Sequence, residues 1–182
     1  MMFAKLLAHP DVKEVVELRG KFGFMAYHGG GLEHLTDVIA QKSAEQSNSS
    51  YYGVHQPRGL KWHVPSHEIS PNFSTSLQSF INHVDIVVTI HGFGREGFFT
   101  SLLLGGRNRN LAGHMSTHLK QHLPMYEICD DLETIPVDLR AAVRRCSDRV
   151  ASTRSWSWQI LERLGWRWFD TSHRVADYSA CF

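Results

Sequence analysis

The sequence predicts an α/β domain in which helices flank a mixed, mostly parallel β-sheet. Apolar runs of strand length alternate with helical patterns over the first two-thirds of the chain, which is typical of layered α/β folds. The run DIVVTIH at 85–91 is apolar almost throughout, as a central strand covered on both faces should be. At 182 residues, the chain is long enough for one domain with a substantial core.

The expected elements follow one another along the chain, and the strands are bounded by turn residues. Ser74 is expected to cap a helix, because its hydroxyl can accept a backbone N–H of the first turn. In open sheets of this kind, ligands bind beyond the carboxyl ends of the strands. The expected strands lie at 14–18, 22–27, 85–91, 98–106 and 124–129, and the expected helices at 33–46, 74–84 and 109–123.

Two segments differ from this pattern. Residues 48–74 are rich in Pro, Ser, Asn and Gly, and we expect long loops around short strands there. Four of the five tryptophans lie in the arginine-rich stretch RSWSWQILERLGWRWFD near the end of the chain. We therefore divide the chain into a domain at 1–140 and an atypical tail at 141–182. The tail is either a docked helix or a segment of altered sequence, and the residues alone do not separate the two.

The overall composition excludes several classes of protein. Hydrophobic residues make up 42% and charged residues 20%, and the net charge of +1 gives no reason to expect a nucleic acid or membrane partner. We expect a cytoplasmic protein, since the N-terminus lacks the long apolar region of a signal peptide. We also expect a monomer. Three scattered cysteines form neither a disulfide framework nor a zinc pattern. The twelve histidines are the compositional surplus.

Two of these histidines end expected strands and are followed by glycine. His28 ends the run FGFMAYH before three glycines, and His91 ends DIVVTIH before Gly92. The glycines permit a sharp turn that would bring Glu33, at the start of a helical pattern, close to both. Two imidazole nitrogens, one carboxylate oxygen and a vacant position make a catalytic zinc site, in which a water of pKa ~7 supplies hydroxide.

Each of these residues also has an ordinary structural explanation. A histidine before glycine at a strand end is more often a turn or hydrogen-bonding residue than a ligand. A glutamate in the first turn of a helix interacts favourably with the helix dipole. His114, His118 and His122 recur on one helix face, where an exposed polar stripe is the more common explanation. Only the combination of His28, Glu33 and His91 indicates a metal site.

Three stretches carry a resemblance to a known family. HGGGLEHLTDVIA, GLKWHVPSHEIS and DIVVTIHGFG with LLLGG follow in the order and spacing of poly-γ-glutamate hydrolases of bacteria and their phages. The chain resembles that family over roughly residues 3–140. The resemblance implies a three-layer fold like that of zinc carboxypeptidases, with His28, Glu33 and His91 as ligands of Zn²⁺. It also implies that His63 lies close to the metal or the substrate.

This resemblance implies an activity and a substrate. The expected reaction is zinc-dependent hydrolysis of the γ-glutamyl amide bonds of poly-γ-glutamate or a related peptide. Such a substrate is polyanionic, and the planar fork of an arginine suits its carboxylates. Arg95 follows the turn after His91, and Arg107 and Arg109 follow the Gly105–Gly106 turn, so we expect these arginines to bind substrate.

The sequence also departs from the family pattern. Pro65 stands where the family tends to have threonine, and the late Gln-Leu-Glu-Leu motif, whose glutamate is the expected general base, is not found. Glu162 is the nearest substitute for that base. Two alternatives therefore stay open: a catalytically silent relative that keeps the fold and the metal, and an interaction module that uses the tail, whose Trp and Arg favour interfaces.

Overall fold

The protein is built around one five-stranded mixed sheet. The computed structural model describes residues 2–92, 96–106, 108–135 and 178–181, and every structural statement below concerns these residues. The central strands run parallel, and the strand at each edge runs antiparallel to its neighbour. In spatial order the strands are β1 (Lys13–Glu17), β3 (Ser50–Gln56), β2 (Phe22–Gly30), β4 (Ile86–Gly92) and β7 (Tyr178–Cys181).

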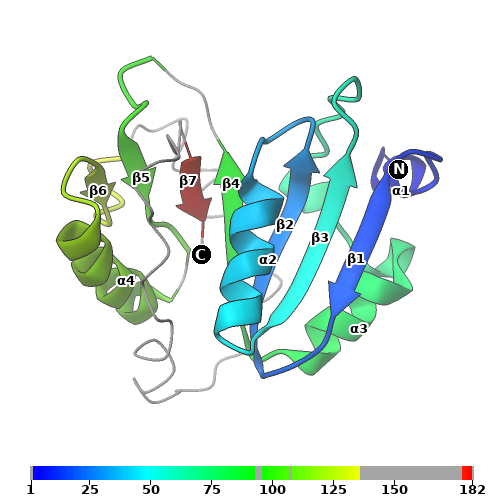
Figure 1. Ribbon diagram of the computed structural model, residues 1–182, viewed down its shortest axis with the longest axis horizontal. Coiled ribbons are helices and arrows are strands. Elements are labelled where there is room, and N and C mark those ends of the chain that lie inside the picture. Colours follow the sequence, from blue (N-terminus) through cyan, green and yellow to red (C-terminus); the bar gives the residue numbers. More distant parts are fainter. Residues whose placement is uncertain (1, 93–95, 107, 136–177, 182) are drawn as a thin grey trace.

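Helices cover both faces of this sheet. Figure 1 shows α2 (Thr36–Gln46) in front of the strands and α3 (Thr75–His83) behind them, which makes three layers. The short helix α1 (Met2–Leu7) lies beside the β1 edge. Two short 3₁₀ helices, Ser66–Glu68 and Pro71–Phe73, lead into α3. The fold class predicted from the sequence is thereby confirmed.

A smaller unit lies on the β7 side of the sheet. The parallel pair β5 (Ser101–Leu103) and β6 (Glu127–Cys129) is joined by α4 (Arg109–His122). The side chain of Asn108 caps α4 by accepting the N–H of Leu111 at 3.0 Å. Apolar side chains of α4 and β6 share one core with β2 and α2, so the unit is packed onto the main layer rather than separate from it.

The two faces of the sheet have separate cores because strand side chains alternate between the faces. On the α2 face, Phe24 and Ala26 of β2 pack with Ala40 of α2. On the α3 face, Met25 and Tyr27 of β2 belong to a second cluster, which includes side chains of α1 and α3. Phe24 and Ala26 thus face α2, and Met25 and Tyr27 face α3.

Some expected elements differ from those observed. The strand β3 lies inside 48–74, where long loops around short strands were expected, and it is an inner strand of the sheet. The helix expected at 33–46 begins only at Thr36, because the backbone of Leu35 has a left-handed conformation with φ 68°. Glu33 therefore lies in a loop and not in a helical turn. The division at residue 140 falls in 136–177, outside the described residues, and stays a prediction.

The cap of α3 is confirmed and gives a testable prediction. Ser74 Oγ accepts the N–H of Leu77 at 2.8 Å and donates to Glu14 on β1. Ser74→Ala should lower the free energy of unfolding by about 1–2 kcal/mol, since it removes a cap and leaves the half-buried carboxylate of Glu14 with one donor fewer. Denaturant unfolding measures the loss. Ser79→Ala, at an exposed position of the same helix, should change stability by less than ~0.5 kcal/mol, and equal effects of the two would contradict the assignment.

None of the helices in the described part of the chain combines the length and the apolar character needed to cross a bilayer.

Candidate metal centre

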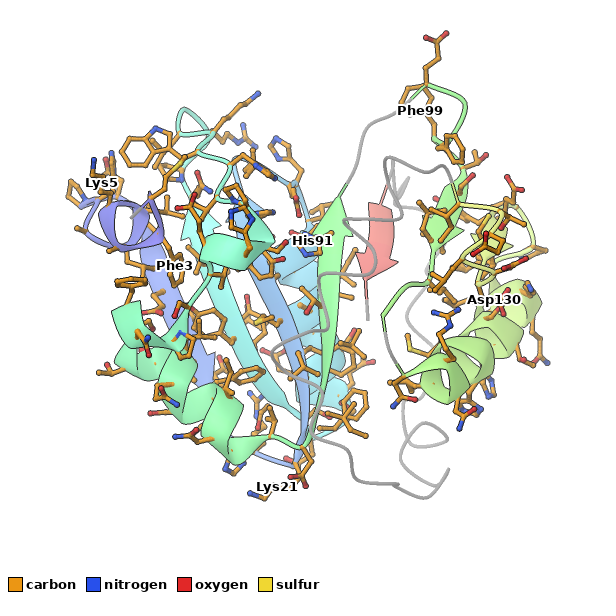
Figure 2. All side chains as sticks on the ribbon, turned by 180° about the vertical axis from the view of Figure 1, so that it is seen from behind. Phe3, Lys5, Lys21, His91, Phe99 and Asp130 are labelled. Atoms are coloured by element: carbon orange, nitrogen blue, oxygen red, sulfur yellow. The ribbon has the colours of Figure 1, made fainter. Side chains whose placement is uncertain are left out.

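His28 and His91 lie at the same edge of the sheet because their strands are parallel neighbours. β2 and β4 pair in register from Phe22 with Ile86 to Met25 with Thr89, so their carboxyl ends adjoin. The two imidazole rings are 5.2 Å apart between centroids, and they are 2% and 9% exposed respectively. Figure 2 shows His91 near the end of β4, on the face of the sheet that α3 covers.

A β-bulge turns His28 towards His91. Ala26 pairs with Gly53 and Gly29 pairs with His55, so three steps along β2 oppose two steps along β3. Strict alternation would put His28 on the α2 face with Ala26, whereas its ring packs against Tyr27 and His91. A bulge inserts one residue and changes the direction of the side chains that follow. The bulge thus makes the pairing of the two histidines possible.

Glu33 connects the two histidines from the loop after β2. Its Oε1 is 2.8 Å from Nδ1 of His28, and its Oε2 is 3.3 Å from Nδ1 of His91. Oε2 also accepts the N–H of Gly92 at 3.0 Å, and the N–H of Glu33 donates to the carbonyl of His28 at 2.9 Å. One ligand atom of each residue lies within 4.8 Å of the others, so the three side chains converge on one point.

The electrostatics of this cluster keep Glu33 ionised. Burial by itself would raise the pKa of Glu33, but hydrogen bonds with His28 and His91, and the positive charge that these rings carry when protonated, outweigh burial and lower the pKa to about 2. The carboxylate is 12% exposed. A buried anion therefore stands between two imidazoles at neutral pH, and it needs cationic or hydrogen-bonding partners to be stable.

The hydrogen bonds of His28 indicate what partner the cluster suits. Its Nε2 is 2.9 Å from the carbonyl oxygen of Val64, and a carbonyl only accepts, so Nε2 carries the proton. In the neutral ring, the lone pair of Nδ1 then faces the carboxylate of Glu33, another acceptor. A divalent cation shared by the two acceptors resolves this conflict, and the second nitrogen of a metal-binding histidine is commonly held by a carbonyl. The donor set of two imidazoles and a carboxylate fits zinc.

Comparison with known proteins adds independent information. A family model described as poly-gamma-glutamate hydrolase matches residues 4–126. The chain belongs to the poly-γ-glutamate hydrolase family. That assignment confirms the family recognised from the sequence, and the matched range includes His28, Glu33 and His91. No curated protein and no solved structure was found to match the chain.

His63, which the family resemblance placed close to the metal or the substrate, lies beside the cluster of His28, Glu33 and His91. The exposed His63 has its ring 4.8 Å from that of His28, next to the three converging side chains. Burial, and then the charge of His28, lower the pKa of His63 despite the opposing effect of Glu33. Ser66, three residues after His63, hydrogen-bonds the hydroxyl of Tyr27 at 2.7 Å.

Of the predicted arginines and the substitute base, Arg109 alone lies within the described residues, and its printed hydrogen bonds are made inside the α4 unit. Arg109 donates to the carbonyls of Leu104 and Gly106 at 3.1 and 3.3 Å and to the carbonyl of Asp130, so its guanidinium holds the α4 unit together. Its role in substrate binding stays a prediction. Arg95, Arg107 and Glu162 lie outside the described residues, as does most of the Trp- and Arg-rich tail.

The sequence analysis missed one polar cluster on the opposite face of the sheet. Tyr51, His55 and Asp37 form a chain of hydrogen bonds between β3 and α2. His55 lies in the middle of the chain, with Nε2 bonded to the hydroxyl of Tyr51 and Nδ1 bonded to the carboxylate of Asp37. Tyr51 reaches His55 across Gly53, where an added Cβ would lie 2.0 Å from the tyrosine oxygen. The signal was present in the sequence, since Tyr, Gly and His occupy alternate positions and therefore share one strand face.

Proposed function

We propose that this chain is a zinc-dependent amide hydrolase that cleaves γ-glutamyl bonds of poly-γ-glutamate or a related peptide. One observation carries the proposal: His28, Glu33 and His91 converge at the carboxyl edge of the sheet in a member of the poly-γ-glutamate hydrolase family. A pair of imidazoles with one carboxylate leaves room for substrate in a four-coordinate site, which is the composition of catalytic rather than structural zinc sites.

Each residue has a role in this proposal. Nδ1 of His28, Nδ1 of His91 and the carboxylate of Glu33 hold the ion, while the carbonyl of Val64 keeps the proton of His28 on Nε2. A zinc ion bound there supplies Lewis-acid chemistry for the attack of water on the amide. His63, exposed beside His28, is positioned to contact the substrate.

The remaining roles are proposals that rest on the sequence. A carboxylate must accept the proton of the attacking water, and Glu162 is the candidate for it. Arg95, Arg107 and Arg109 are the candidates for holding substrate carboxylates, with Arg109 having several of its donors already engaged by main-chain carbonyls.

A second candidate function is that of a catalytically silent relative that binds metal. The observation that favours it is the missing Gln-Leu-Glu-Leu motif. Within the part of the chain that the structure describes, the metal-ligating cluster contains Glu33 as its one carboxylate, and a ligand cannot at the same time act freely as the general base.

Metal analysis and a hydrolysis assay on the full chain separate these candidates. Protein purified without chelator should contain about one zinc ion per chain, and it should shorten poly-γ-glutamate in a reaction that stops with chelator and resumes with zinc. The α-linked polyglutamate, which has the same charge per residue, is the matched control and should stay intact. Zinc without turnover would support the silent relative, and protein that binds no zinc would overturn both candidates.

A further inference from the structure

The buried carboxylate of Asp37 packs against the loop that carries Glu33. Asp37 lies in the first turn of α2 and is 7% exposed. Its Oδ2 accepts from Nδ1 of His55 at 2.8 Å, and its carboxylate is also hydrogen-bonded to the backbone N–H groups of Gly30 and Val38. One side chain thus connects the end of β2, the start of α2 and β3. Asp37 is not one of the residues proposed to hold the metal ion.

The hydrogen bonds among Tyr51, His55 and Asp37 are all donated in the direction of Asp37. Burial, and then the charges of Asp37 and Glu17, raise the pKa of Tyr51, so its hydroxyl keeps the proton and donates to Nε2 of His55 at 3.0 Å. Nδ1 of His55 therefore carries the ring proton and donates it to Asp37. Burial alone would raise the pKa of Asp37, but the hydrogen bonds from His55 and from the backbone N–H groups of Val38 and Gly30 lower it, so the acceptor is a carboxylate.

Asp37 also contacts the backbone next to a proposed metal ligand. A Cβ added at Gly29 would lie 2.5 Å from Cβ of Asp37, so the carboxylate side chain packs directly on the peptide that follows His28. At the next residue but one, the N–H of Gly31 donates to the carbonyl of Gln56 at 2.7 Å. Together these contacts fix a three-glycine backbone that would otherwise have wide conformational freedom.

Fixing this backbone matters because His28 and Glu33 stand at its two ends. Each must place a ligand atom at the same point, and every residue left free between them adds an entropy cost to metal binding. We propose that Asp37, held by His55 and Tyr51, is a positioning residue that orders the loop from Gly29 to Glu33 for metal binding. This inference rests on the proposed function, since it assumes that the cluster binds zinc.

Zinc affinity measured by competition with a chromophoric chelator tests the proposal. Asp37→Asn keeps the size of the side chain but weakens its bonds to His55 and Gly30, so the dissociation constant for zinc should rise about tenfold. Glu14→Gln is the matched control. Glu14 is likewise a carboxylate that accepts a side-chain hydrogen bond, in its case from the hydroxyl of Tyr52 at 2.6 Å, but it lies on β1, which β3 separates from β2. The zinc affinity of the Glu14→Gln variant should stay within about twofold of wild type.

A second pair of variants keeps the proposal testable if Asp37→Asn does not fold. The side-chain amide of asparagine can replace Nδ1 of His55 as donor to Asp37, while alanine cannot. His55→Asn should therefore bind zinc within about threefold of wild type, and His55→Ala about tenfold more weakly. A purely structural role of Asp37 would lower the melting temperature of these variants and leave the affinity of the folded protein unchanged.

The outcomes separate this proposal from the function on which it rests. Wild-type protein that binds no zinc overturns both. Wild-type protein that binds zinc, together with Asp37→Asn that binds it equally well, overturns only the positioning role, as does equal zinc affinity of His55→Asn and His55→Ala. Weak binding by Asp37→Asn and His55→Ala alone, with Glu14→Gln and His55→Asn near wild type, is the result expected.

Discussion

Replacing Glu33 by glutamine is expected to weaken zinc binding and to lower the rate of hydrolysis together. The substitution keeps the shape of the side chain but removes the anion between His28 and His91, and it places an amide where one ligand oxygen stood. We expect the dissociation constant for zinc to rise at least about 100-fold, which exceeds the usual effect of residues that only support a ligand. Metal analysis after dialysis measures this directly.

When zinc is limiting, kcat/KM is expected to fall by a larger factor than the affinity for zinc. A catalytic metal contributes several kcal/mol to lowering the barrier, and 1.36 kcal/mol corresponds to tenfold in rate, so kcat/KM should fall by about 10³-fold or more. Glu45→Gln, at an exposed position of α2, is the control and should behave as wild type. Turnover in wild type that survives Glu33→Gln unchanged would contradict the zinc mechanism. Turnover that vanishes would exclude the silent relative.

The position of the candidate site followed from the sequence because it depends on topology alone. Two apolar runs that each end in histidine and glycine belong to parallel strands, and parallel neighbours have adjacent carboxyl ends. No knowledge of side-chain contacts is needed for that step. The sequence could not, however, predict the bulge between Ala26 and Gly29 that turns His28 towards His91, because bulges depend on pairing with a particular partner strand.

For a related reason, the short strands expected within 48–74 could not be given bounds, and β3 was not located from the sequence. Its sequence, SYYGVHQ, contains a glycine and several polar residues, which weaken the strand preference of its two tyrosines and its valine. These residues are buried in a central strand because their polar atoms find partners: Tyr51 with His55, His55 with Asp37, and Tyr52 with Glu14. Such partners come from other elements, so a reading of the local sequence underestimates how well the strand can be buried.

The late start of α2 shows where sequence rules and the site conflict. A glutamate after a turn is expected to begin a helix, where its charge favours the amino end. The left-handed backbone of Leu35 instead delays the helix to Thr36. A left-handed conformation is unfavourable for a residue with a large side chain, and such strain is most often found at functional sites. Here its effect is to leave Glu33 in a loop from which it reaches both histidines.

Replacing Gly30 by alanine is expected to destabilise the protein and weaken metal binding at once. Gly30 has φ +75°, and an added Cβ would lie 2.2 Å from the carbonyl oxygen of Gln56, a backbone atom of β3 that cannot move alone. The left-handed conformation costs alanine about 1–2 kcal/mol, and the clash adds to it, so the free energy of unfolding should fall by about 2–4 kcal/mol. Displacement of the loop should also weaken zinc binding, because Glu33 follows three residues later.

Two further glycines separate the causes of this effect. Gly97 has φ +85° but nothing within 4 Å of an added Cβ, so Gly97→Ala carries only the conformational cost of about 1–2 kcal/mol. Gly59 also has open space and no positive φ, and Gly59→Ala should be nearly neutral. If Gly30→Ala loses no more stability than Gly97→Ala, β3 yields to the new methyl group. In that case the loop is less tightly held than its contacts indicate, and zinc affinity should be unchanged.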